Sequence, residues 1–267
     1  LISWSVGEYG FGPEDRLTNV NPLFFDNSIF DFYSSLFTGA CLVPFSREEL
    51  RNPIKLVHEI NRKRCTSWFS VPSLLIYLQT MNSLKPDSLP YLKRFIFGGE
   101  GYNKSKLIKL FKLYGKSSRI YNVYGPTECT CICSSYEISE SDFKDENGLP
   151  PLGKIAKNFD FIIVDSKNNS VSIDETGELL LMGDNVGLGY YNDQSLSLKS
   201  FVQNPLHSKY KEIAYRTGDL VRISSQDGKL YFEGRSDYQI KHMGYRIELG
   251  EIESALYRFK DIDEAAI

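Results

Sequence analysis

The first half of the chain alternates between short apolar runs and longer segments with helical spacing, and this alternation constrains the fold more than any other feature. It predicts strands at 16–21, 41–45, 67–71, 94–97 and from 120 onward, and helices at 29–37, 53–62, 72–81 and 104–114. Strands separated by helices of this length form parallel βαβ units. We therefore expect an α/β layer that binds its ligand at the carboxyl ends of the strands.

One turn at such a strand end carries groups that suit a nucleotide. An apolar run breaks at Gly125-Pro126, which no strand interior tolerates. Tyr124 offers a flat ring for a nucleobase, Thr127 a hydroxyl for a phosphate oxygen, and Glu128 a carboxylate for Mg²⁺. The alternative is a structural loop with an exposed acid.

A second turn, Gly98-Gly99-Glu100, follows the predicted strand that ends at Phe97. If this strand neighbours the one that ends at Val123, both turns face one crevice. The two turns would then share a ligand.

After about residue 152 the pattern changes to short β-like runs between turn clusters such as Asp227-Gly228. This predicts a β-barrel-like subdomain or β-layer that packs on the first layer. We divide the chain into an α/β subdomain (1–155), a β-rich subdomain (156–236) and the start of a small C-terminal α+β domain (237–267), whose helix is expected at about 250–259.

Composition excludes several classes of partner and site. A net charge of −3 with 24% charged residues gives no basic face for a nucleic acid. No apolar run approaches the length of a membrane span, and no signal peptide is visible, so we expect no membrane partner. Five cysteines without a disulfide-type spacing indicate a reducing compartment, the cytoplasm. Both ends look cut, so we expect a fragment of a longer protein.

Three of the cysteines, at 129, 131 and 133, alternate, which predicts that they lie on one face of a strand. A zinc site is disfavoured because neither a CxxC pair nor a nearby His completes a tetrahedral ligand set. Small polarizable side chains that line a cavity are the favoured interpretation.

Four charged residues each have a simple structural interpretation beside a functional one. Asp26 can cap a helix or hold a substrate ammonium. Asp219 can be a turn residue or accept both hydroxyls of a ribose. Arg235 and Asp237 can form an ion pair or belong to a site. Taken singly, the structural interpretation is favoured for each of them.

Eight motifs stand in one order along the chain. They are Phe25-Asp26-x-Ser28, Gly98-Gly99-Glu100, Tyr124-Gly125-Pro126-Thr127-Glu128, Gly177-Glu178-Leu179, Gly187-x-Gly189-Tyr190, Tyr215-Arg216-Thr217-Gly218-Asp219, Gly234-Arg235-x-Asp237-x-Gln239-x-Lys241, and Gly244-x-Arg246-Ile247-Glu248. From about Trp4 to its end the chain resembles the adenylate-forming ligases, specifically the amino-acid adenylation domains of nonribosomal peptide synthetases and the D-alanine–carrier-protein ligases.

The resemblance implies an activity. Such enzymes activate a carboxylate with ATP and Mg²⁺ to an acyl-adenylate and pyrophosphate, then pass the acyl group to the phosphopantetheine thiol of a carrier protein. Adenylation places negative charge on phosphorus, so cations are expected to contribute most. By the resemblance, Thr127 touches phosphate, Glu128 holds Mg²⁺, and Lys241 lies, with Gly244, in a segment that swings in for thioester formation. Asp237 matches the hinge of the small domain.

The resemblance also assigns binding residues. Tyr124, with Gly125 beside it, would stack on adenine, and Asp219 would bind the ribose; Gly98, Gly99 and Glu100 would lie on the other side of the base, and Tyr231 and Arg235 near the ribose. Asp26 would hold the α-ammonium of an amino acid. Around it the resemblance places Asn27, Phe30, Ser70, Phe95, Phe97, Val123 and Cys131, a set that suggests a small, uncharged substrate side chain.

The sequence also departs from the family pattern. The glycine-rich phosphate loop would precede Leu1, the catalytic lysine would follow Ile267, and His242-Met243 stands where synthetases often have a hydrophobic residue and Arg. We therefore expect that this fragment does not complete adenylation alone. The alternative from another class is a non-catalytic nucleotide-binding or carrier-docking fragment. A dinucleotide oxidoreductase is disfavoured because no glycine turn has the required spacing.

Overall fold

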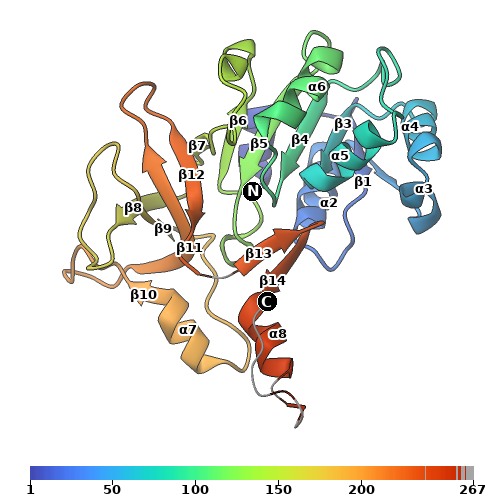
Figure 1. Ribbon diagram of the computed structural model, residues 1–267. Coiled ribbons are helices and arrows are strands. Elements are labelled where there is room, and N and C mark those ends of the chain that lie inside the picture. Colours follow the sequence, from blue (N-terminus) through green and yellow to red (C-terminus); the bar gives the residue numbers. More distant parts are fainter. Residues whose placement is uncertain (238, 257, 260–261, 263–267) are drawn as a thin grey trace.

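The structure is a computed structural model, and it describes residues 1–237, 239–256, 258–259 and 262. Its larger sheet has seven strands (Figure 1). In spatial order they are β2 (Cys41–Pro44), β1 (Arg16–Asn19), β3 (Ser67–Ser70), β4 (Arg94–Gly98), β5 (Arg119–Tyr124), β6 (Ser134–Glu137) and β7 (Lys154–Ile155). The first five are parallel and the last two are antiparallel, so the parallel layer that the sequence predicts is present.

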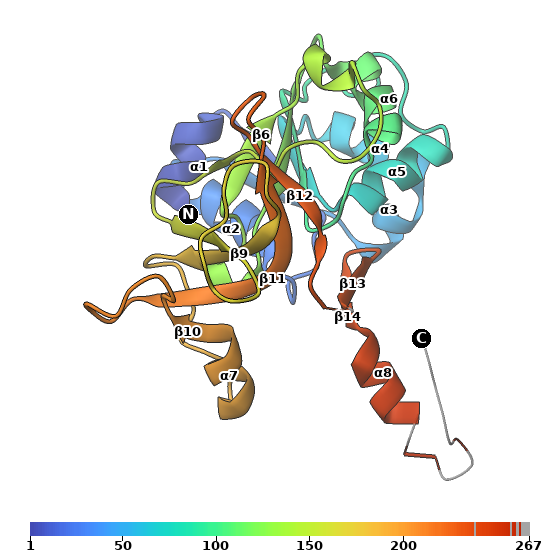
Figure 2. The same cartoon turned by 60° about the vertical axis from the view of Figure 1, so that its left-hand side comes forward.

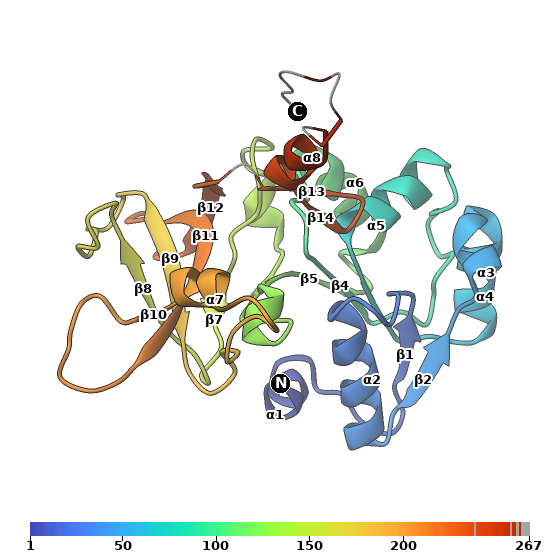
Figure 3. The ribbon, with the colours of Figure 1, turned by 90° about the horizontal axis from the view of Figure 1, so that it is seen from below.

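Helices cover both faces of this sheet, as the view from below shows (Figure 3). On one face lie α1 (Ile2–Tyr9) and α2 (Asn27–Thr38); on the other lie α3 (Arg47–Arg51), α4 (Pro53–Arg62), α5 (Pro72–Thr80) and α6 (Lys104–Tyr114). Two short 3₁₀ helices, η1 (Thr127–Cys129) and η2 (Glu140–Phe143), flank β6. The sheet is therefore a buried central layer, as parallel sheets require.

Local sequence signals explain several helix ends. Asn52 caps α4 by accepting a hydrogen bond from the Lys55 N–H at 3.0 Å, and Pro53 takes the first helical position, where no N–H is needed. Gly39 ends α2 in the left-handed conformation. Asp26 stands at the N-cap of α2, but its side chain makes no capping hydrogen bond, so the predicted cap is not formed.

Strand alternation sends neighbouring side chains of β3 and β4 into two different cores. Trp68 and Phe95 are paired in register and pack among the apolar residues of α4, α5 and α6. Phe69 and Ile96 are also paired in register and pack on the opposite face, with residues of α1 and α2. Each face of the sheet therefore has its own apolar cluster.

The second sheet is antiparallel and lies beside the first (Figure 1). Its strands run in the order β10 (Phe201–Gln203), β11 (Ile213–Ile223), β9 (Gly177–Met182) and β8 (Asp160–Val164), and β12 (Leu230–Arg235) pairs with β11. The helix α7 (Gln194–Ser200) precedes β10. The pairings among the described strands do not close into a barrel: β8 pairs only with β9, and β10 and β12 pair with successive parts of β11, so these three strands are edges. The described strands therefore form the β-layer that the sequence analysis offered beside the barrel-like subdomain.

A β-hairpin and a helix end the described chain. The hairpin consists of β13 (Gln239–His242) and β14 (Tyr245–Glu248), and α8 (Leu249–Leu256) follows it and projects away from both sheets (Figure 2). The apolar strand that the sequence suggests at 265–267 lies outside the described residues. Within the described part of the chain, none of the helices has the length and apolar character needed to cross a bilayer.

A buried carboxylate ties the start of the chain to the sheet and predicts a pH-dependent stability. Asp15 accepts hydrogen bonds from the Thr66 hydroxyl at 2.7 Å and from the Arg94 guanidinium at 2.9 Å. Burial raises the pKa of Asp15, but the hydrogen bond from Thr66 and the charge of Arg94 outweigh it and lower the pKa below its ordinary value of 3.8. A carboxyl with a lowered pKa stabilises the fold above that ordinary value and ceases to do so as the pH falls through the folded-state pKa.

We expect Asp15→Asn to lower the free energy of unfolding by about 2 kcal/mol at pH 7, because the replacement removes a charge-assisted pair at a buried position. The difference from the unsubstituted protein should shrink at pH 3. Urea unfolding at the two pH values measures it. An equal difference at both would mean that the ion pair with Arg94 contributes nothing.

Candidate functional site

The carboxyl ends of β4 and β5 form one side of the site. The two strands are neighbours, with Gly98 paired to Val123, so the two turns that follow them meet as the sequence predicts. A Cβ atom at Gly98 would lie 2.4 Å from the Val123 carbonyl oxygen, and one at Gly125 would lie 2.2 Å from the Cys131 carbonyl oxygen. Only glycine allows these close backbone approaches.

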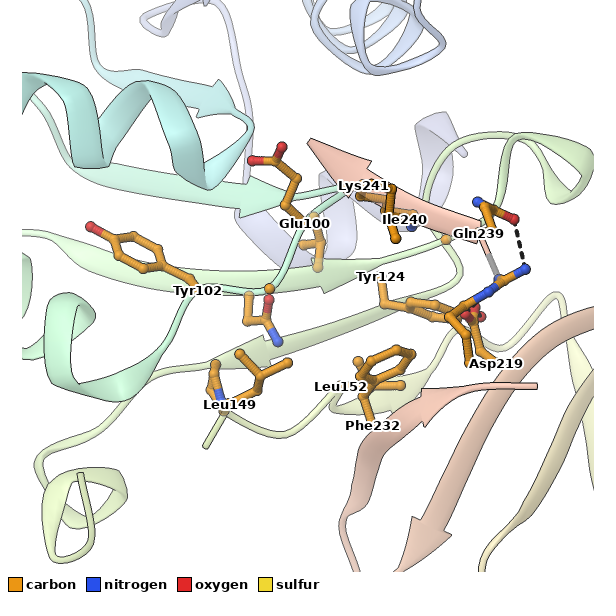
Figure 4. A pocket seen from close by; sticks show the side chains of 17 residues that line it. Glu100, Tyr102, Tyr124, Leu149, Leu152, Asp219, Phe232, Gln239, Ile240 and Lys241 are labelled. Carbon is orange, nitrogen blue, oxygen red and sulfur yellow. Dashed lines mark hydrogen bonds and ion pairs between the residues drawn. The ribbon is translucent and has the colours of Figure 1, made fainter. Parts of the chain in front are cut away.

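A cavity of about 320 Å³ opens at this edge, between the two sheets and the β13–β14 hairpin (Figure 4). This volume lies at the lower end of the range for small-molecule sites. Its walls come from both turns, both sheets and the hairpin, and they include Gly99, Glu100, Tyr124, Gly125, Leu152, Asp219, Phe232, Arg235 and Lys241. Segments far apart in the sequence therefore converge on one ligand-sized space.

Two of the residues predicted to bind the nucleotide contact each other directly. The Tyr124 hydroxyl donates to the Asp219 carboxylate at 2.5 Å, and the Arg235 guanidinium binds the other oxygen of that carboxylate at 2.7 Å (Figure 4). Asp219 is 3% exposed. Burial raises the pKa of Tyr124 well above its usual range and the charge of Asp219 raises it further, so the phenol stays a donor at neutral pH.

A bulge in β11 aims the Asp219 carboxylate into the cavity. Between Arg216 and Leu220 this strand advances four residues while β9 advances two, from Leu180 to Glu178. Gly218 has a φ of +70°, which a residue with a Cβ rarely adopts. The bulge interrupts the regular alternation of β11, and Asp219 lies at this interruption.

Asp26, Thr127 and Lys241 lie close to one another beside the cavity. The Thr127 hydroxyl donates to Asp26, whose pKa is raised mainly by burial and also by the charge of Glu128. The Lys241 side chain reaches solvent, yet the surrounding walls lower its pKa through loss of hydration, while the Asp219 and Asp26 carboxylates act to raise it. Lys241 is thus within electrostatic reach of both acids.

Glu128, predicted to hold Mg²⁺, is engaged by other residues. It receives hydrogen bonds from the Tyr190 hydroxyl at 2.6 Å and from the Arg246 guanidinium at 2.9 Å. Burial raises the pKa of Glu128, but these two partners outweigh it and the pKa is lowered overall. No group of three His, Cys, Asp or Glu suited to a metal occurs among the described residues. As arranged, the site does not fit the ion.

Of the other residues predicted to bind the nucleotide, Glu100 lines the cavity and Tyr231 does not. Glu100 stands at the start of α5 and accepts a hydrogen bond from the Ser73 N–H at 3.1 Å. Tyr231 does not line the cavity: it donates to Asp227 at 2.8 Å, and its neighbour Phe232 points inward instead. A one-residue difference along a strand reverses the side-chain direction.

The predicted substrate residues Phe30, Val123 and Cys131 come together on the α1/α2 face of the sheet. Phe30 is 0% exposed and packs against Phe69, with ring centroids 4.9 Å apart, and against Tyr9 at 5.7 Å. The Asn27 amide lies beside Gly99, which lines the cavity.

Three other predicted substrate residues, Ser70, Phe95 and Phe97, point to the opposite face. Phe95 and Phe97 pack against Tyr114 and Tyr102, and Ser70 accepts a hydrogen bond from the Trp68 indole at 2.7 Å. The structure therefore does not bring them to Phe30. In their place it brings Phe69, Ile96 and Ile132, which the sequence analysis missed. The two-residue period of β3 and β4 shows that Phe69 and Ile96 face away from Ser70, Phe95 and Phe97, but because both faces are buried it does not show which face lies toward Phe30.

The three neighbouring cysteines do not share one face. Cys129 belongs to 3₁₀ helix η1, and Cys131 has a φ of +74°, so no strand runs through 129–133. Cys131 packs with Phe30, whereas Cys129 and Cys133 pack under the second sheet. All three are free and buried.

Asp237, the predicted hinge, forms an ion pair with Arg235. The guanidinium contacts both oxygens of Asp237, at 2.9 and 2.5 Å, and its Nη2 also donates to Gln239 at 2.6 Å. Because Arg235 also binds Asp219, a single guanidinium links the cavity wall to the start of the hairpin.

Comparison with known proteins identifies the family. Residues 2–191 match the sequence profile of the family described as AMP-binding enzyme. The chain belongs to this family. It is 36% identical to bacitracin synthase 1 of Bacillus licheniformis over 243 residues, which are 91% of the chain and 4% of that protein. It is 33% identical to the D-alanine–D-alanyl carrier protein ligase of Bacillus velezensis over 253 residues, 95% of the chain and 48% of that ligase.

Solved structures agree with this family. The adenylation domain AlmE of Vibrio cholerae, solved with glycyl-adenosine-5′-phosphate, matches 96% of this chain with a TM-score of 0.83 at 29% identity, over 47% of its own length. Holo-PA1221, which has adenylation and PCP domains and a bound vinylsulfonamide inhibitor, matches 96% of the chain with a TM-score of 0.85 at 29% identity, over 43% of its length. The chain spans about half the length of the D-alanine ligases that it matches, and 4–6% of the peptide synthetases.

Proposed function

We propose that this protein activates a small amino acid with ATP to an aminoacyl-adenylate and then passes the aminoacyl group to the phosphopantetheine thiol of a carrier protein. One arrangement carries this proposal: the Tyr124–Asp219 pair lines a ligand-sized cavity beside the half-buried acid Asp26. The pair suits the base and ribose of AMP, and the half-buried acid suits an α-ammonium. The carrier thiol and a cytoplasmic location are part of the proposal; the five free cysteines suit a reducing compartment.

The charges around the cavity support this chemistry. The carboxylate oxygen of the amino acid attacks the α-phosphorus of ATP, and the bond to pyrophosphate breaks. The thiol sulfur then attacks the carbonyl carbon, and AMP leaves. Lys241 lies within electrostatic reach of both Asp219 and Asp26, between the proposed nucleotide and ammonium sites, so its positive charge can stabilise negative charge that develops there. Asp237 and Gln239 connect this strand to Arg235, which supports a role for Asp237 at the hinge.

Close packing around Phe30 supports a substrate with a hydrogen or methyl side chain. Phe30 is fully buried, and Phe69, Ile96 and Cys131 beside it are nearly so. A fully buried surface leaves no adjacent space for even a water molecule. A larger substrate side chain would have to displace these residues, at a cost of a few kcal/mol. The glycyl-adenylate complex of the similar AlmE agrees with a small substrate.

Binding of sulfamoyl-adenosine analogues, which mimic the aminoacyl-adenylate, tests the proposal. We expect the glycyl and alanyl derivatives to bind at least roughly tenfold more tightly than the phenylalanyl derivative in isothermal titration calorimetry, because of the steric cost around Phe30. Asp26→Asn should weaken the glycyl derivative and leave AMP binding unchanged. Asp145→Asn, a change at an exposed loop acid, is the matched control.

Equal binding of the phenylalanyl derivative would overturn the assignment of a small substrate, and failure of AMP itself to bind would overturn the function. Amino-acid-dependent ATP–pyrophosphate exchange measures the reaction in the full-length protein, because this chain is not expected to complete adenylation alone. Tight binding of the analogues without any exchange by the full-length protein would favour the non-catalytic alternative.

A further inference from the structure

A groove lies between the end of α6 and the 3₁₀ helix η2, and it is distinct from the nucleotide cavity. It encloses about 910 Å³ and is lined by the second half of α6, by the two residues after this helix, and by η2 with the residue that follows it. The cavity instead meets the chain at Gly101 and Tyr102, before α6 begins. The 11 residues of α6 span about 16 Å, and in Figure 1 this helix lies at the top of the larger sheet, with the β13–β14 hairpin below it. The groove therefore lies away from the nucleotide cavity.

The floor of the groove is apolar. The Phe111 ring from α6 and the Phe143 ring from η2 contact each other, with centroids 5.0 Å apart, and Ile108 lies one turn before Phe111. Both rings pack on the apolar core of this face of the larger sheet, yet they stay partly exposed and line the groove. A partner that covered them would bury apolar surface that is already ordered.

Hydrogen bonds fix the position of η2, the second wall of the groove. Oδ1 of Asp142 accepts from the Tyr136 hydroxyl at 2.8 Å, and Oδ2 accepts from the Ser139 N–H at 2.7 Å. Tyr136 belongs to β6, so this wall is tied to the larger sheet. A groove whose walls are both held in place loses little conformational entropy when a ligand binds, which favours affinity.

The charged residues around this floor are mostly positive. Lys112, Lys116 and Lys144 line the groove together with one acid, Glu140, so the lining carries a net charge of +2 (three lysines minus one glutamate), whereas the whole chain carries −3. The three lysines are exposed, and in the described part of the chain none of their ammonium groups pairs with an acid. Several lysines elsewhere do pair with acids. Folding therefore leaves the positive charge of the groove available to a partner.

We propose that the groove between α6 and η2 binds an acidic segment of a partner protein. Apolar side chains of this segment cover Phe111 and Phe143, and its carboxylates lie against Lys112, Lys116 and Lys144, so that charge and apolar character are matched at once. Nucleic acid is a poorer match, because a phosphate backbone gains nothing from the apolar floor and is repelled by the glutamate in the groove. A segment bound here leaves the nucleotide cavity open, so the groove can hold a partner while the site is occupied.

Fluorescence polarisation with a labelled peptide tests this inference. The probe is a helical peptide of glutamates with leucines along one face, and we expect a dissociation constant of about 10–100 µM at low ionic strength that weakens as salt is added. Lys112→Glu combined with Lys116→Glu should weaken binding at least roughly tenfold, because two attractive charges become repulsive. Lys106→Glu combined with Lys109→Glu is the matched control, since both lysines are exposed on the same helix but do not line the groove.

Two further probes test the chemistry of the partner. A peptide with serine in place of leucine should bind about tenfold more weakly, because it leaves the apolar floor uncovered. Absence of binding by the leucine peptide at about 1 mM, equal binding of the serine peptide, or equal weakening by both pairs of substitutions would overturn the inference.

A single-stranded oligonucleotide that bound more tightly than the leucine peptide, and that lost its binding in the Lys112→Glu and Lys116→Glu protein, would assign the groove to nucleic acid and also overturn the inference. AMP binding should be the same with and without the peptide, because the groove and the cavity share no lining residue in the described part of the chain. The peptide is titrated without nucleotide, so this inference and the proposed function are tested separately.

Discussion

Replacing Asp219 by alanine is expected to lower the free energy of unfolding by about 3 kcal/mol and to weaken AMP binding at least a hundredfold. The stability loss follows because Asp219 is the buried partner of Arg235, and removal of one member leaves the other charge partly desolvated without compensation. The binding loss follows because, among the described residues that line the cavity, Asp219 is the carboxylate that Tyr124 contacts and that is proposed to bind the ribose. Urea unfolding and calorimetric titration with AMP measure the two effects.

Glu233→Ala is the matched control for Asp219. Glu233 also belongs to the second sheet and pairs with an arginine, Arg222, at 3.0 Å, but it does not line the cavity. Its removal should reduce stability by a smaller amount and leave AMP binding unchanged. Equal loss of binding in both variants would show that the cavity depends on general integrity of the sheet and not on the Asp219 carboxylate.

Phe30→Ala is expected to change which amino acid the site accepts. Truncating this fully buried ring should lower the free energy of unfolding by about 3–5 kcal/mol, because the surrounding rings collapse only in part. The same space should admit a larger substrate side chain. We expect the phenylalanyl sulfamoyl-adenosine to gain at least roughly tenfold in affinity relative to the glycyl derivative, since each tenfold step needs only 1.4 kcal/mol of the contact energy that the ring supplied.

Phe95→Ala separates the two effects, because Phe95 is the same residue type, is equally buried, and lies on the opposite face of the sheet. It should destabilise the protein by a similar amount without widening substrate selection. If Phe95→Ala widened selection as much as Phe30→Ala does, the selection would reflect general loosening of the fold. Affinities are compared at a temperature where both variants are folded.

Sequence reasoning predicted the parallel layer well because helices and strands of regular length alternate there and each leaves a periodic pattern. It also predicted that Tyr124 and Asp219 lie at one site, although they are 95 residues apart in the sequence. It did not predict to which face of the sheet each strand side chain points. Ser70, Phe95 and Phe97 were predicted to lie with Phe30, but Phe69 and Ile96 pack there instead. Tyr231 was predicted to lie near the ribose, but its neighbour Phe232 lines the cavity.

These errors share one physical cause. In a strand buried on both faces, hydrophobicity no longer shows which residue faces which side, because apolar residues point to both sides. Only the register between β3, β4 and β5 decides it, and register is a tertiary property. Backbone conformation was the second obstacle. The positive φ angles at Thr130 and Cys131 turn the chain out of a strand, and neither residue type is typical of such a turn.

The two surplus residues of β11 make the protein sensitive to chain length at one particular place. Loss of the codon for Thr217 or Gly218 would shift the side-chain alternation by one and turn the Asp219 carboxylate to the outer surface, while each neighbouring strand kept its composition. Length changes in the exposed loop 208–211 carry no such penalty. A scan of single-codon deletions across this half of the gene should therefore show one narrow interval in which the protein still folds but no longer binds the nucleotide.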